Sequence, residues 1–154
     1  MSAYYFDTSA LVKRYVAEVG STWVRSTIAR RSGHVSYASV LAQPEAISAL
    51  QRKVREGHLE EDRARALARR VTTHFAHSYA PVAITPSVIA QACELLHHYP
   101  LRAYDALQLA SAMAVRGVLR QNALPTLLFV AADDILLAAA AAEGFIVDNP
   151  LLHP

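Results

Sequence analysis

Short apolar runs alternate with amphipathic stretches along the chain, and this alternation predicts strands separated by helices. Five runs have the length and the apolar or aromatic content of strands. They cover residues 3–6, 34–37, 81–84, 126–130 and 145–147. Between them, apolar side chains recur at helical spacing. The helices are expected near residues 8–15, 22–29, 45–55, 60–74, 87–98, 103–115 and 133–144.

This order of elements predicts a fold of the α/β class. Strands that alternate with helices are joined by crossovers and lie parallel to one another. We therefore expect a three-layer α/β/α sandwich around a short, mainly parallel central sheet. No internal repeat, linker or low-complexity segment interrupts the pattern, so the expectation is one domain over residues 1–154.

The composition supports a globular chain and argues against a membrane partner. The 154 residues are 53% hydrophobic and 18% charged, which is an ordinary balance for a packed domain. The longest apolar run, Ile135–Ala142, is far short of the roughly 20 residues that cross a bilayer. No basic stretch followed by an apolar segment opens the chain. We expect a soluble, cytoplasmic protein.

The small net charge of +2 is spread unevenly. Residues 1–70 hold 12 Lys/Arg and 7 Asp/Glu, whereas residues 71–154 hold 3 and 6. Many of the basic side chains lie within residues 52–70, where they could bind an RNA backbone. They are Arg52, Lys53, Arg55, Arg63, Arg65, Arg69 and Arg70. Because acidic residues are interleaved with them, a plain solvated helical face remains the alternative.

Four acidic residues are the candidate site: Asp7, Glu45, Asp105 and Asp133. Asp7 and Asp133 each follow a predicted strand, and ligands of open α/β sheets bind at the carboxyl ends of strands. Glu45 and Asp105 lie near predicted helix starts, where the helix dipole favours a carboxylate. Each acid alone could be a turn, cap or first-turn residue, so the prediction depends on the set of four.

Acidic side chains gathered in one cleft indicate a metal site. Carboxylates repel one another in a low-dielectric cleft, so a fold that gathers them needs a cation. Oxygen-only ligands select hard ions such as Mg²⁺ or Mn²⁺. Such an ion can lower the pKa of a bound water and stabilise charge on a phosphoryl group. The pattern therefore predicts phosphodiester hydrolysis, with Asp7, Asp105 and Asp133 as metal ligands and Glu45 as a ligand or an orienter of the water.

Four segments, in this order and spacing, also carry a family resemblance. They are Tyr5–Lys13 (YFDTSALVK), Glu45–Leu50 (EAISAL), Arg102–Ala110 (RAYDALQLA), and Phe129–Asp133 (FVAAD) followed by Ala141–Phe145 (AAEGF). The chain resembles PIN-domain ribonucleases, and specifically the VapC-type toxins of type II toxin–antitoxin pairs. The similarity runs nearly from end to end.

The resemblance implies an Mg²⁺- or Mn²⁺-dependent endoribonuclease. Its substrate would be RNA, its usual state a homodimer, and its inhibitor a small antitoxin protein that blocks the site. By the same resemblance, Ser9 supports the carboxylate of Asp7. Asp134 is a supporting candidate, to which the role of Asp133 could shift where the neighbouring hydroxyl is missing. Arg14 is a candidate for binding a substrate phosphate or an antitoxin carboxylate.

Two positions depart from the family pattern. The residue two before Asp133 is often Thr or Ser in the family and is Ala131 here, so one hydrogen bond to the site is expected to be missing. Pro44 directly precedes Glu45, where it has no backbone N–H to donate. Pro44 would either occupy the first position of the helix or kink a helix that begins at Ser39.

Two other functions are compatible with the sequence. A phosphatase of the haloacid-dehalogenase type also begins with an Asp after the first strand, but that class has a second Asp two residues later, where this chain has Ser9. The other alternative is a catalytically weak or inactive PIN-like domain that binds RNA or protein.

Three further residues are interpreted as structural. Cys93 is the only cysteine and is expected to be buried on a helical stripe with neighbouring apolar residues. His97 and His98 have no third ligand at metal-binding spacing and are expected in the surface or the core.

Overall fold

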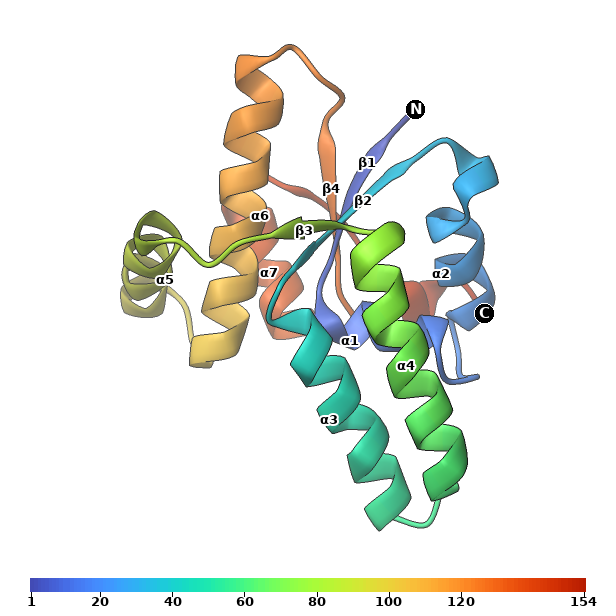
Figure 1. The fold of residues 1–154 in the computed structure, drawn as a ribbon. Coiled ribbons are helices and arrows are strands. Elements are labelled where there is room, and N and C mark those ends of the chain that lie inside the picture. The colour runs from blue at the N-terminus through green and yellow to red at the C-terminus, as the bar shows by residue number, and fades with distance from the viewer.

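The computed structural model describes residues 1–154 and contains one five-stranded sheet with the order β3-β2-β1-β4-β5 (Figure 1). All neighbouring strands are parallel. The strands are β1 (Ala3–Phe6), β2 (Val35–Ser39), β3 (Ala80–Val82), β4 (Leu127–Val130) and β5 (Ile146–Asp148). Each predicted strand is present within a few residues of its expected place, and the predicted fold class is confirmed.

Seven α-helices connect the strands. They are α1 (Thr8–Leu11), α2 (Ser21–Ile28), α3 (Ala42–Arg55), α4 (Glu61–His77), α5 (Pro86–His98), α6 (Ala103–Gln121) and α7 (Asp134–Ala142). Three short 3-10 turns complete the chain: η1 (Val12–Arg14), η2 (Arg30–Ser32) and η3 (Pro150–Leu152). The predicted first helix is thus divided between α1 and η1. No helix is both long enough and apolar enough to span a membrane.

Helices cover both faces of the sheet, and each face has its own core. Helices α5, α6 and α7 pack on one face, while α1 to α4 pack on the other (Figure 1). Alternate residues of β1 serve the two cores: Tyr5 faces the first and Phe6 the second. In the first core the fully buried rings of Tyr5 and Phe129 stack with centroids 5.5 Å apart.

The first turn of α3 accommodates Pro44. The helix begins at Ala42, so Pro44 is its third residue. The first four N–H groups of a helix have no partner within the helix, so Pro44 loses no hydrogen bond there. Both positions predicted for Pro44, the first helical residue and a kink after Ser39, were wrong. Glu45 consequently lies in the first turn of α3.

The burial predicted for Cys93 was wrong. Helix α5 places Val88, Ala92 and Leu95 against the core, and Cys93 is exposed. Apolar residues recur on two adjacent stripes of this helix, and the buried stripe is the one displaced by one residue, or about 100° of helix rotation. The outer stripe, with Ile89 and Leu96, stays exposed.

The end of the chain packs against α2. The rings of Trp23 and His153 stack with centroids 4.4 Å apart and an angle of 5° between their planes. Gly20, the N-cap of α2, has a φ of 86°, and a Cβ on this residue would lie 2.3 Å from the carbonyl oxygen of Pro150. Only glycine fits that backbone and that approach. His97 and His98 are both exposed at the end of α5.

Candidate functional site

The four candidate acids belong to the edge of the sheet where the strand order reverses. From β1 the chain continues to β2 and β3 on one side, whereas β4 and β5 lie on the other. The backbone N–H of Asp7 donates to the carbonyl of Val130 at 2.9 Å, so the ends of β1 and β4 are joined there. This switch point, at the carboxyl ends of the strands, is where open α/β sheets bind ligands.

Asp7 is buried and is held in place by Ser9. The carboxylate caps α1, and its Oδ2 accepts the Ser9 backbone N–H at 3.0 Å and the Ser9 hydroxyl at 2.5 Å. The same hydroxyl oxygen accepts the backbone N–H of Ala132 at 2.9 Å. Ser9 therefore ties the segment after β1 to the segment after β4. Both bonds to Asp7 fall on Oδ2, which leaves Oδ1 available to a ligand.

The surroundings of Asp7 make its ionised form costly. Burial raises the pKa of the carboxyl, the hydrogen bonds from Ser9 oppose that rise, and the charge of Asp105 adds to it. A cation beside a carboxylate favours the ionised form and offsets burial. Asp7 is thus a carboxylate whose ionised form a nearby metal ion would stabilise.

Glu45 reaches the same region from the first turn of α3 and is held by Gln108. The side-chain amide of Gln108 donates to Glu45 Oε1 at 3.0 Å and to the Thr8 hydroxyl at 3.1 Å. Its carbonyl oxygen accepts the Tyr5 hydroxyl at 2.7 Å. Burial raises the pKa of Glu45, the bond from Gln108 lowers it, and the charges of Asp7 and Asp105 raise it further.

Gln108 was not predicted as a site residue, although the sequence contains a signal for it. Gln108 is buried in α6 beside Leu109 and Ala110, which belong to the apolar core. A buried polar side chain needs hydrogen-bond partners. An amide within an apolar stripe, three residues after Asp105, therefore marks a side chain that is positioned by polar neighbours.

Asp105 and Asp133 lie at the starts of α6 and α7. Asp105 Oδ2 accepts the backbone N–H of Arg102 at 3.3 Å and its Nε at 3.1 Å. Asp133 caps α7, because its Oδ1 accepts the N–H groups of Ile135 and Leu136 at 3.0 and 3.1 Å. Asp133 Oδ2 lies 4.0 Å from Nη2 of Arg102. One guanidinium thus lies beside both carboxylates.

Asp134 has a different neighbour. This residue is exposed, and its carboxylate accepts the side-chain amide of Asn149 at 3.2 Å. Asp133, rather than Asp134, therefore caps α7 and faces the guanidinium. Ala131, the residue directly after β4, is buried, and its backbone N–H donates to the carbonyl of Asp148 at 3.2 Å. With no hydroxyl at position 131, Asp133 is fixed through its bonds to the start of α7.

The donor set fits a hard divalent cation. All candidate ligands are carboxylate oxygens, and the protein bonds of Asp7, Asp105 and Asp133 each occupy mainly one oxygen. The charges of Asp7, Glu45 and Asp105 act on one another. No three His, Cys, Asp or Glu side chains lie close enough to hold a metal ion as they stand. Arg102 is the positive group now found beside Asp105 and Asp133.

Arg14 lies away from these acids. Its guanidinium is 5.2 Å from the centre of the Tyr79 ring, and its Nη1 is buried without a hydrogen-bond partner. The Tyr15 hydroxyl bonds both His74 Nδ1 and the Tyr79 hydroxyl at 2.9 Å. Burial, with the charges of Arg14 and Arg70, lowers the pKa of His74 to about 4. A residue that binds the same substrate phosphate as the four acids is expected to lie beside them. The guanidinium of Arg14 lies beside the Tyr79 ring instead.

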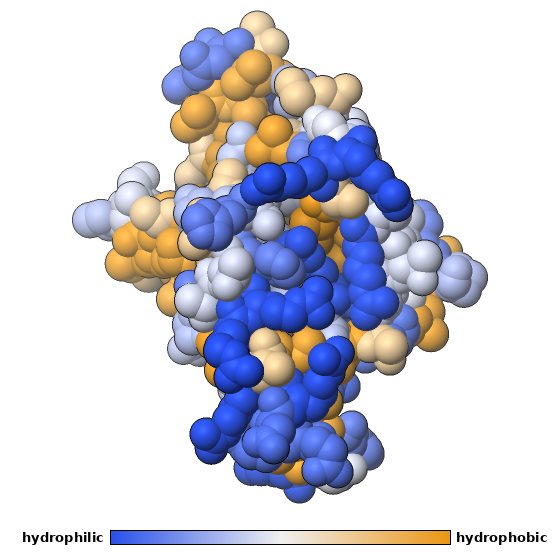
Figure 2. Space-filling model, turned by 45° about the vertical axis from the view of Figure 1, so that its right-hand side comes forward, coloured by the Kyte–Doolittle hydropathy of each residue, from blue (hydrophilic) through white to orange (hydrophobic).

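The basic residues 52–70 lie on the pair α3 and α4. These helices pack side by side and project beyond the sheet (Figure 1). Figure 2 shows strongly hydrophilic side chains spread over the face that carries α4. Most of the basic residues there are exposed, and Arg65 pairs with Glu61 at 3.0 Å. An exposed basic surface thus extends from the helix that carries Glu45.

Sequence comparison assigns the chain to a family. Residues 4–141 match the PIN domain. The chain belongs to the PIN domain family. All four acids lie inside the matched residues. The PIN domain assignment confirms the resemblance drawn from the four sequence segments.

Known relatives extend this assignment. The curated protein Ribonuclease VapC45 of Mycobacterium tuberculosis is 36% identical over 115 residues, which cover 75% of this chain and 78% of the relative. The crystal structure of Mycobacterium tuberculosis VapC20, a sarcin-ricin loop cleaving toxin, is similar with a TM-score of 0.62 and 17% identity, covering 98% of this PIN domain chain and 99% of that one. The structure of VapBC2 from Rickettsia felis, bound to a DNA fragment from its promoter, is similar with a TM-score of 0.60 and 10% identity, covering 96% and 98%. The two solved structures support the fold.

Proposed function

We propose that this PIN domain is a metal-dependent endoribonuclease and the toxin of a toxin–antitoxin pair. The observation that carries the proposal is the buried carboxylate of Asp7, fixed by Ser9 at the switch point of the sheet and influenced by the charges of Asp105 and Glu45. Support comes from Ribonuclease VapC45, with which the chain shares 36% identity over 115 residues.

The metal would be Mg²⁺ or Mn²⁺, held by Asp7, Asp105 and Asp133. When bound, such an ion lowers the pKa of a water and neutralises charge that develops on the phosphoryl oxygens. The hard oxygen donors and the raised pKa of Asp7 support this choice. Arg102, the positive group beside two of the three acids, would have to move aside.

The residues of the chain then have distinct tasks. Ser9 keeps Asp7 oriented, and Gln108 keeps Glu45 oriented from the opposite core. Glu45 orients the attacking water, a task for which a partly buried carboxylate with a raised pKa is suited. The water oxygen would form a bond to phosphorus as one ester P–O bond breaks. The water would lose one proton and the departing ester oxygen would gain one, which leaves one phosphate end and one hydroxyl end on the RNA.

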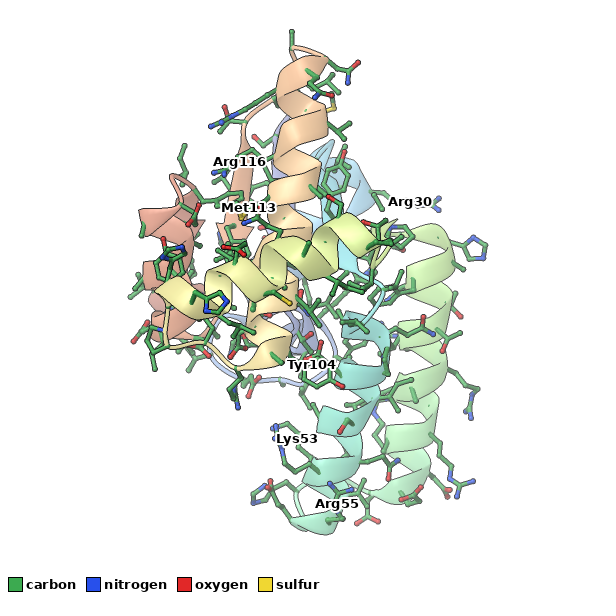
Figure 3. The ribbon with its side chains drawn as sticks, turned by 90° about the vertical axis from the view of Figure 1, so that its left-hand side faces the viewer. Arg30, Lys53, Arg55, Tyr104, Met113 and Arg116 are labelled. Carbon is green, nitrogen blue, oxygen red and sulfur yellow. The ribbon has the colours of Figure 1, made fainter.

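The RNA would approach along the side of the molecule that carries α3 and the start of α6. Figure 3 shows Tyr104, Lys53 and Arg55 on this side. Tyr104 is 57% exposed and directly precedes Asp105, so its ring can stack on an RNA base close to the acids. The basic side chains of α3 and α4 would contact phosphates without reading sequence.

A small antitoxin and a second copy of the chain are the proposed protein partners. The similarity to VapBC2 supports the antitoxin, which would inhibit by covering the acids at the switch point. The apolar stripe of α5, with Ile89, Cys93 and Leu96 exposed, offers a surface for the homodimer. The proposed place of action is the cytoplasm.

The test is cleavage of total cellular RNA by the purified protein freed of antitoxin. The reaction is run with Mn²⁺ or Mg²⁺, with EDTA, and with Asp7→Ala, Asp105→Ala and Asp62→Ala. We expect discrete fragments that require the metal, vanish in the first two variants and persist in Asp62→Ala, because Asp62 is an exposed acid on α4. Full activity of Asp7→Ala or Asp105→Ala in a folded protein would refute the assignment.

A second function is favoured by one observation. Arg102 already neutralises part of the acidic set, and no three acids lie close enough to hold a metal as they stand. A PIN domain that binds RNA or protein without turnover is compatible with this arrangement. Binding of RNA with no cleavage under any metal condition would support this second function.

A further inference from the structure

Arg102 contacts two of the carboxylates that the proposed function assigns to a metal. Its Nε is 3.1 Å from Asp105 Oδ2 and its Nη2 is 4.0 Å from Asp133 Oδ2. The side chains of Asp105 and Asp133 are only 17% and 29% exposed, whereas that of Arg102 is 82% exposed. The side chain of Arg102 is therefore mostly in solvent, and its guanidinium lies beside two carboxylates that are largely buried.

We propose that Arg102 is a resident counter-ion of the acidic site, which a divalent cation displaces, and that the displaced guanidinium then binds a phosphate of the RNA. This inference rests on the proposed function and adds a named residue to it. Arg102 would neutralise Asp105 and Asp133 in the protein without metal. It would contribute to substrate binding in the protein with metal.

The first half of the inference follows from the ion pairs themselves. Arg102 and a divalent cation compete for the same two carboxylates, and like charges repel each other at this range. Exposed ion pairs contribute little to stability, so the guanidinium can leave Asp105 at small cost. Arg102 is the N-cap residue of α6, outside the helix itself, and its side chain is 82% exposed, so no packing holds it against Asp105.

The second half follows from the chemistry of the guanidinium. Once a cation neutralises the carboxylates, Arg102 loses its partners but remains tethered at the edge of the site. The planar fork of an arginine binds the oxygens of a phosphate in a two-point contact. An RNA phosphate close to the acids would be the nearest anion that replaces the lost ion pairs.

The structure also shows how to change the side chain without unfolding α6. Asp105 Oδ2 accepts the backbone N–H of Arg102 at 3.3 Å, and this bond does not depend on the side chain. Arg102→Gln keeps it and removes the charge, and Arg102→Lys keeps the charge and removes the fork. Arg120→Gln is the matched control, because Arg120 is an exposed arginine at the other end of the same helix.

The first experiment measures Mn²⁺ binding by calorimetry, without RNA, on the full chain freed of antitoxin. Removing a competing positive charge should tighten Mn²⁺ binding by about three- to fivefold in Arg102→Gln. Arg102→Lys and Arg120→Gln should stay within about twofold of wild type. Circular dichroism of each variant confirms that the fold is retained.

The second experiment measures binding of a fluorescein-labelled U20 RNA by anisotropy, in EDTA and in Ca²⁺, read before any cleavage. In Ca²⁺, Arg102→Gln should bind about tenfold more weakly than wild type, because the guanidinium is then free for phosphate. In EDTA the two proteins should agree within about twofold, since Arg102 is then engaged with Asp105.

The outcomes separate this inference from the proposed function. Mn²⁺ binding that is equally tight or weaker in Arg102→Gln would overturn the counter-ion role and leave the metal site standing. Equal RNA binding by the two proteins in Ca²⁺ would overturn the phosphate role. If neither wild type nor Arg102→Gln binds Mn²⁺, the metal-dependent function fails, and the inference fails with it.

Discussion

The hydroxyl of Ser9 joins the two segments that carry Asp7 and Asp133, and its removal by Ser9→Ala should cost measurable stability. The hydroxyl donates to Asp7 Oδ2 at 2.5 Å and accepts the Ala132 N–H at 2.9 Å. A hydrogen bond to a charged group contributes about 1.5–3 kcal/mol, and a neutral one about 0.5–1.5 kcal/mol. The unfolding free energy of Ser9→Ala should therefore fall by about 2–4 kcal/mol at a pH above the raised pKa of Asp7, where the carboxylate is ionised.

Urea denaturation, followed by circular dichroism on the metal-free protein, measures this loss. With an m value of about 2 kcal/mol/M for a chain of this size, the midpoint should fall by about 1–2 M. Ser26→Ala is the control, because Ser26 is exposed on α2 and bonds only the Trp23 carbonyl. Its effect should stay within about 0.5 kcal/mol.

The loss of stability in Ser9→Ala should also depend on pH. The bonds from Ser9 oppose the raised pKa of Asp7, so they favour the ionised carboxylate. As the pH falls through the raised pKa of Asp7, the carboxyl becomes protonated and this preference disappears. The difference in unfolding free energy between wild type and Ser9→Ala should therefore become smaller at low pH. A midpoint for Ser9→Ala equal to that of Ser26→Ala, or a difference that does not change with pH, would refute the linking role of Ser9.

Three further changes test other parts of the structure. The raised pKa of Asp7 means that the folded state binds more protons than the unfolded state between the ordinary and the raised values, so this group lowers stability as the pH rises through that window. The lowered pKa of His74 acts in the opposite sense, so the test compares metal-free wild type with Asp7→Asn, in which His74 is unchanged. The melting temperature of Asp7→Asn should rise relative to that of wild type from pH 4.5 to 7.5. A difference in melting temperature that stays constant over this range would contradict the raised pKa of Asp7. Gln108→Leu removes the acceptor of the buried Tyr5 hydroxyl and the donor to the Glu45 carboxylate, so urea midpoints should show a loss of about 1–3 kcal/mol in unfolding free energy. RNA cleavage should slow at least tenfold, and unchanged cleavage would contradict the proposed positioning of Glu45 by Gln108. Gly20→Ala should unfold at a clearly lower temperature than Gly33→Ala, because both have a positive φ but only the first would clash with Pro150; equal melting temperatures would contradict the packing of the chain end on α2.

The order of the elements and the place of the four acids could be predicted because strong local patterns set them. Asp7 and Asp133 follow apolar strands, and the carboxyl ends of parallel strands share one edge of the sheet. Glu45 and Asp105 lie in the first turns of their helices, as expected. Local pattern alone specifies these positions, because each depends on where one strand ends or one helix begins.

The parts that could not be predicted depend on contacts between distant segments. Helix α5 has two apolar stripes, and only its packing against α6 decides that Cys93 faces solvent. Helix α6 continues to Gln121, beyond the predicted end near residue 115, because its far turns still bury Leu119. The partners of Gln108 lie on other elements, and so does Asp133, the second carboxylate beside Arg102. The sequence therefore shows an unusual polar residue but not these distant partners.

The position of β1 in the middle of the sheet sets the time at which the site can form during synthesis. Strand β4, which pairs with β1, begins 120 residues after Asp7 and is therefore made much later. At a ribosomal rate of roughly 5–20 residues per second, several seconds pass before Ala132 and Asp133 exist. A growing chain therefore carries Asp7 and Glu45 without the other half of their site. The four acids can come together only after Asp133 has been made, so the proposed nuclease activity would begin late in the synthesis of this domain.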